Sequence, residues 1–412
     1  MARFGRGFPS KPIIKPKTTS VAAYSINAAA GAFSLSGIAA TLLTTKTVNA
    51  AAGTFTLSGA NASLLAGRFT NANTGTFSLT GVSATLLKTK LLNLGTGAFS
   101  LTGASAILAR GLFINAGPGT YSLTGIATTL LAAKLINAQS GTYNLTGQAA
   151  TLLANRLLSL SAGTYTLTGI NASLTIGHSL NAEPGTFSVT GSSVTLVRTY
   201  VINANAGTFV LSGQNATLLA ARLISALAGT YNLSGIESAL LAGRLLNASL
   251  GTFTLTGIAT TLLANRLLFA GTGTFTLTGY DANLIVTSGI TLNAEPGTFL
   301  LSGSSASLLA NRTLNLNTGA YSLVGKNANL LSGRLINALF GQFVLVGDDT
   351  DLQKSGNPVM NAELGTFILS GKPAQLIFSG EPVVELFGAI LKQPAGVRFE
   401  DLLREDEEIL IL

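Results

Sequence analysis

The sequence predicts an all-β fold, an elongated repeat array in the form of a β-solenoid with about three short strands in each unit. A 22-residue unit recurs sixteen times from Gly31 onward, and the period is broken only by two steps of 24 residues, before Gly297 and before Gly365. When positions are numbered as slots from the first glycine of each unit, slots 1 and 7 are always glycine and slot 3 is always Phe or Tyr. A unit this small cannot bury its own apolar face alone, so a fixed period of this length indicates a repeat architecture.

The copy that begins at Gly251 shows how a unit divides into strands and turns. Thr252–Thr256 alternates threonine with Phe or Leu, which predicts a strand with apolar residues on one face and threonine on the other. Gly257 is expected to end this strand. A second apolar run follows at Thr261–Leu263, and a third at Arg266–Leu268 leads into a turn before the next unit. The two-residue insertions fall between the second and third runs, where we expect a loop that points outward.

Stacking of one unit on the next would align the slot-3 rings into a ladder that runs along the array. The members of this aromatic ladder are Phe33, Phe55, Phe77, Phe99, Tyr121, Tyr143, Tyr165, Phe187, Phe209, Tyr231, Phe253, Phe275, Phe299, Tyr321, Phe343 and Phe367. Slot 19 is Asn in twelve of fifteen array copies. Two explanations fit these asparagines: stacked amides can hydrogen-bond along the array, and Asn tolerates the left-handed backbone of a tight turn.

Cations recur at slot 16 and favour alternatives to a single-chain solenoid. One coil per unit would place neighbouring cations only about 4.8 Å apart, at a cost of roughly 0.9 kcal/mol for each pair in water. An antiparallel β-meander or an intertwined fibre would space them better. The members of this cationic ridge are Lys46, Arg68, Lys90, Lys134, Arg156, Arg222, Arg244, Arg266, Arg312 and Arg334. The ridge is interpreted as a solubilising surface, with binding of an anionic polymer as the alternative.

Slots 12 and 13 are both usually leucine, which makes both faces of the second strand apolar. Either the strand lies in a wall that the chain itself covers on both sides, or another subunit covers the outer side. This pattern predicts a homo-oligomer, and a trimer is the expected form.

The charge distribution divides the chain into three regions. Residues 1–20 form a basic, proline-containing arm, residues 21–371 form the sixteen-copy array, and residues 372–412 form a degenerate cap and an acidic tail. The first acidic residue is Glu183. The termini are either simply solvated, or the arm docks on an acidic partner or on the next molecule, head to tail. The cations expected to anchor the arm are Arg3, Arg6, Lys11, Lys15 and Lys17.

Few residues in this chain are suited to catalysis, and we predict that it is not an enzyme. It has no cysteine and one histidine, His178, which occupies slot 16 and is expected to be a substituted surface cation. Asp348, Asp349 and Asp351 lack the spacing of a calcium loop, so no metal or other cofactor is expected. A membrane-spanning helix is not expected, because no long apolar run occurs. Nucleic-acid binding is not expected either, because sixteen of the 28 aromatic residues lie in the ladder.

The repeat G-T-F/Y-x-L-x-G-x-x-A-x-L-L-x-x-R-L-x-N-A resembles tandem repeats in structural proteins of tailed bacteriophage virions and in related proteins of their alphaproteobacterial hosts. The resemblance covers residues 27–371 and implies a virion component, a fibre or a head or tail decoration protein, made in the host cytoplasm. The arm would then attach to other virion proteins, and the far end or the cationic ridge would meet host surface glycans. The alternative is an extracellular bacterial filament or adhesin. A more distant one, suggested by the Thr rows of slots 2, 4 and 6, is an ice-binding solenoid.

Overall fold

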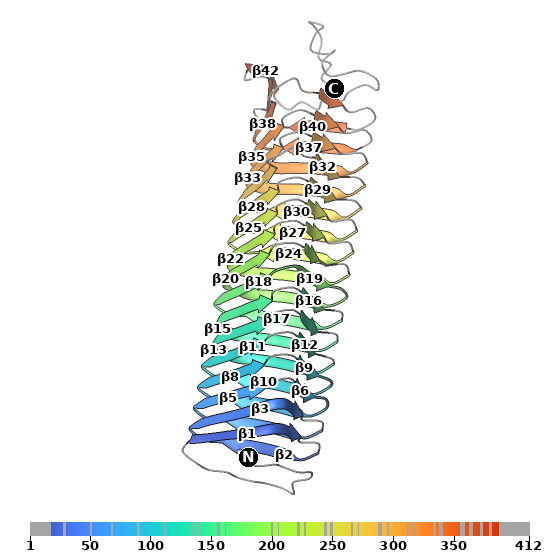
Figure 1. The fold of residues 1–412 in the computed structure, drawn as a ribbon. Coiled ribbons are helices and arrows are strands. Elements are labelled where there is room, and N and C mark those ends of the chain that lie inside the picture. Colours follow the sequence, from blue (N-terminus) through green and yellow to red (C-terminus); the bar gives the residue numbers. More distant parts are fainter. Residues whose placement is uncertain are drawn as a thin grey trace. The chain divides into compact units, whose positions relative to one another are not determined.

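The computed structural model describes residues 18–386, apart from short breaks. The breaks are residues 28–29, 50–51, 67–68, 89–90, 111–112, 117, 133–134, 139, 155–156, 161, 199–200, 205, 221–222, 226–227, 243–244, 248–249, 265–266, 271, 287–290, 295, 311–312, 316–317, 333–334, 338–340, 355–358, 362–365, 371–373 and 379–380. The chain forms two compact units, which divide near residue 200: unit 1 also contains residues 207–213, and unit 2 also contains residues 200–206. Each unit is a β-solenoid, and the described residues contain strands but no helix (Figure 1).

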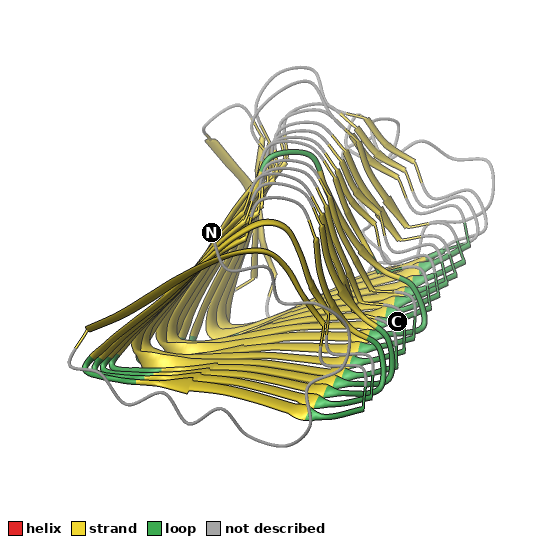
Figure 2. Cartoon of the chain, turned by 60° about the horizontal axis from the view of Figure 1, so that its bottom comes forward, coloured by secondary structure: helices red, strands yellow, loops and turns green. Residues whose placement is uncertain are grey.

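Unit 1 consists of coils with three walls, and each wall is a parallel sheet (Figure 2). Wall A, from slots 2–6, contains β2 (Ala32–Ser36), β4 (Thr54–Ser58), β7 (Thr76–Thr80), β10 (Ala98–Thr102) and β17 (Thr164–Thr168). Wall B, from slots 9–14, contains β5 (Asn61–Ala66), β8 (Ser83–Lys88), β11 (Ser105–Arg110) and β18 (Asn171–Ile176). Wall C, from slots 17–20, contains β6 (Phe69–Ala72), β9 (Leu91–Leu94), β12 (Phe113–Ala116), β14 (Leu135–Ala138), β16 (Leu157–Leu160) and β19 (Ser179–Ala182).

Some strands of unit 1 pass through a corner and serve two walls. β1 (Thr18–Asn27) and β3 (Ala39–Asn49) run through walls B and C, whereas β13 (Thr120–Ala132), β15 (Thr142–Ala154) and β20 (Thr186–Arg198) run through walls A and B. The expectation that the slot-7 glycine ends a strand therefore holds for coils such as that of β4 and is wrong for β13 and β15. There Gly125 and Gly147 pair in register, and the ladder of hydrogen bonds continues past them.

Unit 2 repeats the plan. Wall A contains β24 (Thr230–Ser234), β27 (Thr252–Thr256), β30 (Thr274–Thr278), β37 (Gln342–Val346) and β40 (Thr366–Ser370). Wall B contains β25 (Glu237–Ala242), β28 (Ala259–Ala264), β31 (Asp281–Val286), β38 (Asp349–Lys354) and β41 (Ala374–Phe378). Wall C contains β21 (Val201–Asn203), β23 (Leu223–Ser225), β26 (Leu245–Asn247), β29 (Leu267–Ala270), β32 (Thr291–Ala294), β34 (Thr313–Asn315), β36 (Leu335–Asn337) and β39 (Val359–Asn361). Three strands run through walls A and B: β22 (Thr208–Ala220), of which residues 208–213 belong to unit 1, β33 (Thr298–Ala310) and β35 (Ala320–Ser332).

The coils within each unit stack with equivalent slots in direct register. Phe55 pairs with Phe77 and Leu57 with Leu79, and the same 22-residue offset recurs in the other coils. Where the period lengthens, Leu267 pairs with Thr291, which locates the two extra residues between the second and third strands as the sequence predicts. The loop itself, residues 287–290, lies outside the described residues. These parallel pairs confirm the solenoid and exclude the antiparallel meander as the plan of the array. β42 (Glu381–Leu386), which pairs with β41, is antiparallel.

Register brings the aromatic ladder together as predicted. In unit 1 the rings stack without interruption from Phe33 to Phe209, and in unit 2 from Tyr231 to Phe343. Adjacent ring centroids are between 4.1 and 5.1 Å apart and the ring planes lie within 15° of each other. This spacing equals the distance between neighbouring strands, so each ring rests on its counterpart one coil away. Phe367 continues the backbone register, but its side chain is not described.

The core of each unit lies inside the three walls. The rings of slot 3 pack there with the apolar residues of slots 5, 10, 12 and 18, as Phe55, Leu57, Ala62, Leu64 and Val48 illustrate, and all five are fully buried. Residues of slots 2, 4 and 6 point outward and are half-buried or exposed. The predicted division of the first strand into an apolar and a threonine face is therefore confirmed.

Candidate functional surfaces

The outer side of wall A is a face of hydroxyl groups, formed by slots 2, 4 and 6. In unit 1 these slots are mainly Thr and Ser, and successive coils repeat them in register, as Thr54 over Thr76 and Ser58 over Thr80 show. Within one row, the Cα atoms of successive coils are thus about 4.8 Å apart, and the Cα atoms of neighbouring rows are roughly 6.6 Å apart along a strand. No residue at these slots is charged in any of the sixteen copies. The hydroxyl face is suited to an uncharged partner that offers repeated hydrogen-bonding groups.

Hydroxyl groups of slots 4 and 6 are paired along the strand. The side-chain oxygens are 3.4 Å apart in Ser78 and Thr80, and 3.3 Å apart in Ser100 and Thr102. Equivalent pairs occur at Ser122 with Thr124 (3.2 Å) and at Ser188 with Thr190 (3.4 Å). Each pair keeps free lone pairs for an external donor, because a hydroxyl can accept twice and donate once.

The middle row of the hydroxyl face is interrupted. Slot 4 is Asn144 and Val210 in unit 1, and in unit 2 it becomes Leu300 and Val344. These side chains are half-buried on the outer face, between the rows of slots 2 and 6. An ice-binding face requires an unbroken lattice, so the interruptions count against that function, most of all in unit 2.

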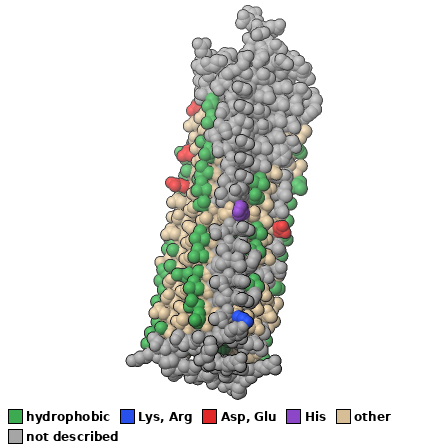
Figure 3. Space-filling model, viewed as in Figure 1, with side chains coloured by type: hydrophobic (Ala, Val, Ile, Leu, Met, Phe, Trp, Pro, Cys, Tyr) green, Lys and Arg blue, Asp and Glu red, His purple; other side chains and the backbone are tan. Residues whose placement is uncertain are grey.

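The outer side of wall B, taken together with slot 8 immediately before it, is more apolar and carries two rows of large apolar side chains. The sequence predicts that the leucines of slots 12 and 13 make both faces of this strand apolar, and the structure agrees. Leu42 of slot 12 is fully buried, whereas Leu43 of slot 13 is 46% exposed. The slot-8 row, directly after the second conserved glycine, was missed by the sequence reasoning. Ile38 and Val82 in this row are 62% and 66% exposed. Apolar side chains form a column beside the strands labelled β5, β8 and β11 (Figures 1 and 3).

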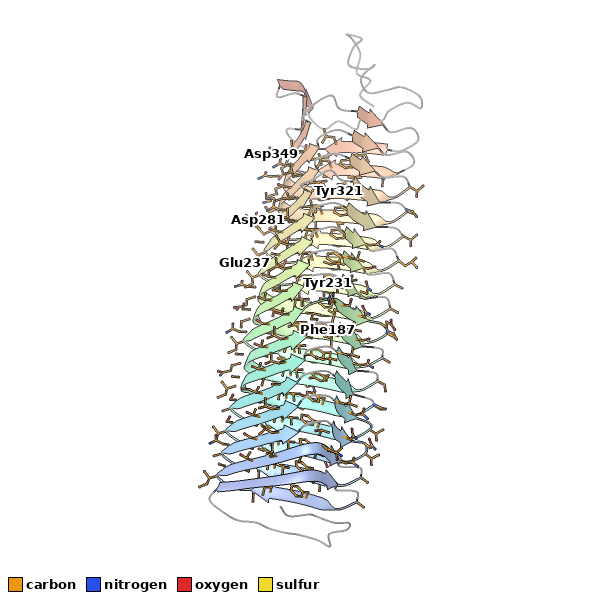
Figure 4. All side chains as sticks on the ribbon, in the orientation of Figure 1. Phe187, Tyr231, Glu237, Asp281, Tyr321 and Asp349 are labelled. Atoms are coloured by element: carbon orange, nitrogen blue, oxygen red, sulfur yellow. The ribbon has the colours of Figure 1, made fainter. Side chains whose placement is uncertain are left out.

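Wall B differs in charge between the two units. Slots 8, 9, 11 and 13 carry no charge in unit 1, whereas in unit 2 slot 9 carries Glu237, Asp281 and Asp349. All three acidic side chains are exposed and point away from the core, opposite to the buried Tyr231 and Tyr321 (Figure 4). Slot 8 adds two exposed charged residues to the same wall, Lys326 and Asp348. This asymmetry was not anticipated, although the first acid at Glu183 is the signal from which it could have been predicted.

Slot 19 lies on the outer side of wall C. Ile202, in slot 18, is fully buried, and its neighbours Val201 and Asn203 are half-buried. The asparagines stack in register, for example Asn71 on Asn93 and Asn115 on Asn137. This backbone register is the alignment that the axial hydrogen-bonding interpretation requires. They belong to strands, which removes the need for a left-handed turn at these positions.

Several predicted site residues fall outside the described residues. They are the anchoring cations Arg3, Arg6, Lys11, Lys15 and Lys17, the cap and tail beyond residue 386, and the ridge residues Arg68, Lys90, Lys134, Arg156, Arg222, Arg244, Arg266, Arg312 and Arg334. Lys46 and His178, which share slot 16, are described and exposed. The arm boundary stays a prediction, and β1 begins at Thr18, three residues before the proposed start of the array.

The stacked tyrosines place hydroxyl groups inside the core. Tyr165 is fully buried, and its hydroxyl has no hydrogen-bond partner among the described residues. Burial raises the pKa of Tyr165 well above its ordinary value, and the charge of an ionised Tyr121, two coils away, raises it further. Burial likewise raises the pKa of Tyr231 and of Tyr321. A buried hydroxyl that has no hydrogen-bond partner destabilises the fold even when it is neutral, and burial disfavours its ionised form still more.

We expect Tyr165→Phe to stabilise unit 1 by about 1 kcal/mol, because it removes a buried hydroxyl that lacks a partner and keeps the ring in the ladder. The folded-state pKa is raised, so this tyrosine disfavours folding as the pH rises above about 10, where the unfolded chain ionises. The variant should therefore lose less stability than the wild type between neutral and strongly alkaline pH. Denaturant midpoints at both pH values measure this, and an equal alkaline loss in the two proteins would contradict it.

The described residues contain no group of three or more His, Asp or Glu side chains placed to hold a metal ion. No helix in the described part of the chain has the length and hydropathy needed to cross a membrane. No protein-family model, curated protein or solved structure matches the chain.

Proposed function

We propose that this chain is a non-enzymatic structural protein of a tailed-phage virion, a fibre or a head or tail decoration protein. The observation that carries the proposal is the one-to-one register of the coils, which places equivalent slots of successive copies over one another along each unit. A structure of this kind grows by adding units and gains rigidity from contacts between neighbours alone. The sequence resemblance of residues 27–371 to virion repeat proteins supports the same proposal.

The hydroxyl face of unit 1 is the part of this surface that we assign to contact with neutral host glycans. It is uncharged, and it presents hydroxyl pairs such as Ser78 with Thr80 at each of several successive coils. A polymeric glycan offers its own hydroxyl groups at repeated intervals. Individually weak contacts would then add through effective concentration, without any single deep pocket.

Deletion of the anchoring arm tests whether the chain is a virion protein. In phage particles purified from a host that expresses the chain, we expect the full-length protein to be present, and a variant with residues 1–17 deleted to be lost from particles while staying folded. The deletion stops before Thr18 because residues 18–20 belong to β1 and pair with β3. Quantitative mass spectrometry of the particles, with circular dichroism of the purified variant, measures both outcomes.

A second, full-length variant distinguishes the loss of the arm's positive charge from the loss of the arm itself. In this variant Gln replaces Arg3, Arg6, Lys11, Lys15 and Lys17. We expect this variant to be lost from particles as well, because the arm is proposed to dock through its positive charge. Particles that keep the truncated chain would refute the anchoring role. Full-length protein found on the surface of uninfected cells, and not in particles, would replace the virion function with that of a bacterial filament or adhesin.

A further inference from the structure

We propose that the outer side of wall B in unit 1 is an interface at which two copies of this chain pack face to face. This inference does not depend on the virion function. The argument uses three observations on the same surface: its apolar rows, its size and the lack of charge at slots 8, 9, 11 and 13.

Two rows of exposed apolar side chains run along wall B of unit 1, and they are interrupted where slot 8 is Gln148 or Ser192 and where slot 13 is Thr175. In unit 1 the slot-8 row contains Ile38, Val82, Ile126 and Ile170, all at least half exposed. The slot-13 row contains Leu43, Leu87, Leu153 and Val197, each exposing between 38% and 46% of its surface. Between the rows lie the short polar or apolar side chains of slots 9 and 11. Monomeric proteins seldom leave continuous apolar patches larger than a few hundred square ångströms exposed.

The wall has the area that a stable dimer needs. Apart from β1, its strands in unit 1 are β3, β5, β8, β11, β13, β15, β18 and β20. At a spacing of about 4.8 Å and a length of about 20 Å for six residues, they cover roughly 750 Å². A standard protein interface buries about 800 Å² on each partner. The wall of one unit is therefore sufficient without any contribution from the other.

A second copy is the partner that matches this wall. Apolar side chains that recur at the spacing of the coils fit best against rows of the same spacing, and another copy offers such rows. Two such sheets can pack with their strands nearly aligned, about 10 Å apart. When two copies pack through the same wall, both walls are used up, and the assembly is a closed dimer. We therefore infer a pair in place of the three copies expected from the sequence.

Charge assigns the interface to unit 1 and not to unit 2. Interface cores are depleted of charged residues. In unit 1 the outward slots 8, 9, 11 and 13 are uncharged, and the charged residues of these strands, Lys88, Arg110 and Arg198, occupy slot 14 at the end of the wall, where their side chains are not described. In unit 2 slot 9 carries Glu237, Asp281 and Asp349, all exposed. Burial of these carboxylates against a second copy would bring like charges together or desolvate them without a partner.

The test measures the mass of the full chain in solution and uses two matched variants. Wild-type protein at about 10 μM, a concentration at which standard interfaces hold, should sediment as two copies of the 41.9-kDa chain. Leu87→Lys with Leu153→Lys in unit 1 should weaken association at least about 100-fold and give one copy. The control, Leu309→Lys with Leu331→Lys, changes slot-13 residues of similar exposure in unit 2 and should leave the pair intact.

Each other outcome overturns the proposal. A wild-type chain that sediments as one copy, or as three, excludes the pair, and this measurement needs no variant. A pair that survives the unit-1 substitutions, or that is lost equally in the unit-2 control, excludes the assignment to wall B of unit 1. Circular dichroism melting of each variant verifies folding, and Leu87→Gln with Leu153→Gln provides a milder change of the same sites if the lysine variant fails to fold.

Discussion

Replacement of Phe77 by alanine is expected to destabilise unit 1 by about 4 kcal/mol. The ring is fully buried and lies between Phe55 and Phe99, with centroid distances of 4.7 and 5.0 Å and planes within 4° of both neighbours. Its removal leaves a cavity on the axis of the stack and breaks two ring contacts at once. Backbone pairing on both sides prevents the coils from closing over the gap.

The neighbouring residue provides the control for this prediction. Ser78→Ala changes the outer face of the same strand, where the side chain is half-buried, and should alter the free energy of unfolding by no more than about 0.5 kcal/mol. Chemical denaturation followed by circular dichroism compares the two variants. Equal effects of the two substitutions would show that the ladder does not form the core of unit 1.

Gly125→Ala is expected to destabilise unit 1 by about 3 kcal/mol, although it adds a single methyl group. A Cβ atom at this position would overlap the carbonyl oxygen of Gly103 in the neighbouring coil and lie 3.2 Å from the carbonyl carbon. The obstructing atoms are backbone, so relief requires a shift of the whole coil. The slot-7 glycines are therefore needed for close approach between coils.

The first glycine of the array provides the matched control. An added Cβ at Gly31 meets no atom within 4 Å, so Gly31→Ala should be neutral or slightly stabilising through its effect on the unfolded chain. Thermal melting of both variants decides the matter, with an expected fall on the order of 10 °C for Gly125→Ala. A tolerated alanine at Gly125 would show that adjacent coils are farther apart than the structure places them.

Much of the fold could be predicted because the same residue pattern occurs in sixteen copies. Invariant rings at slot 3 and alternation through slots 2–6 identify one buried and one exposed face, and Phe55 with Thr54 confirms both. The candidate surfaces were less predictable. The slot-8 row follows a glycine, where alternation gives no indication of direction, and Ile38 could equally have pointed into the core.

The sequence by itself determined the period, the three runs in each unit, the position of the two insertions and the aromatic ladder, since all of these depend on local pattern and on identity between copies. The tertiary structure alone decided that the copies stack in parallel, because a meander would satisfy the same local pattern. It also decided which of the two adjacent leucines faces outward, and why slot 7 has to be glycine. These last properties arise from contacts between residues 22 positions apart, and such contacts exist only once one coil lies on the next.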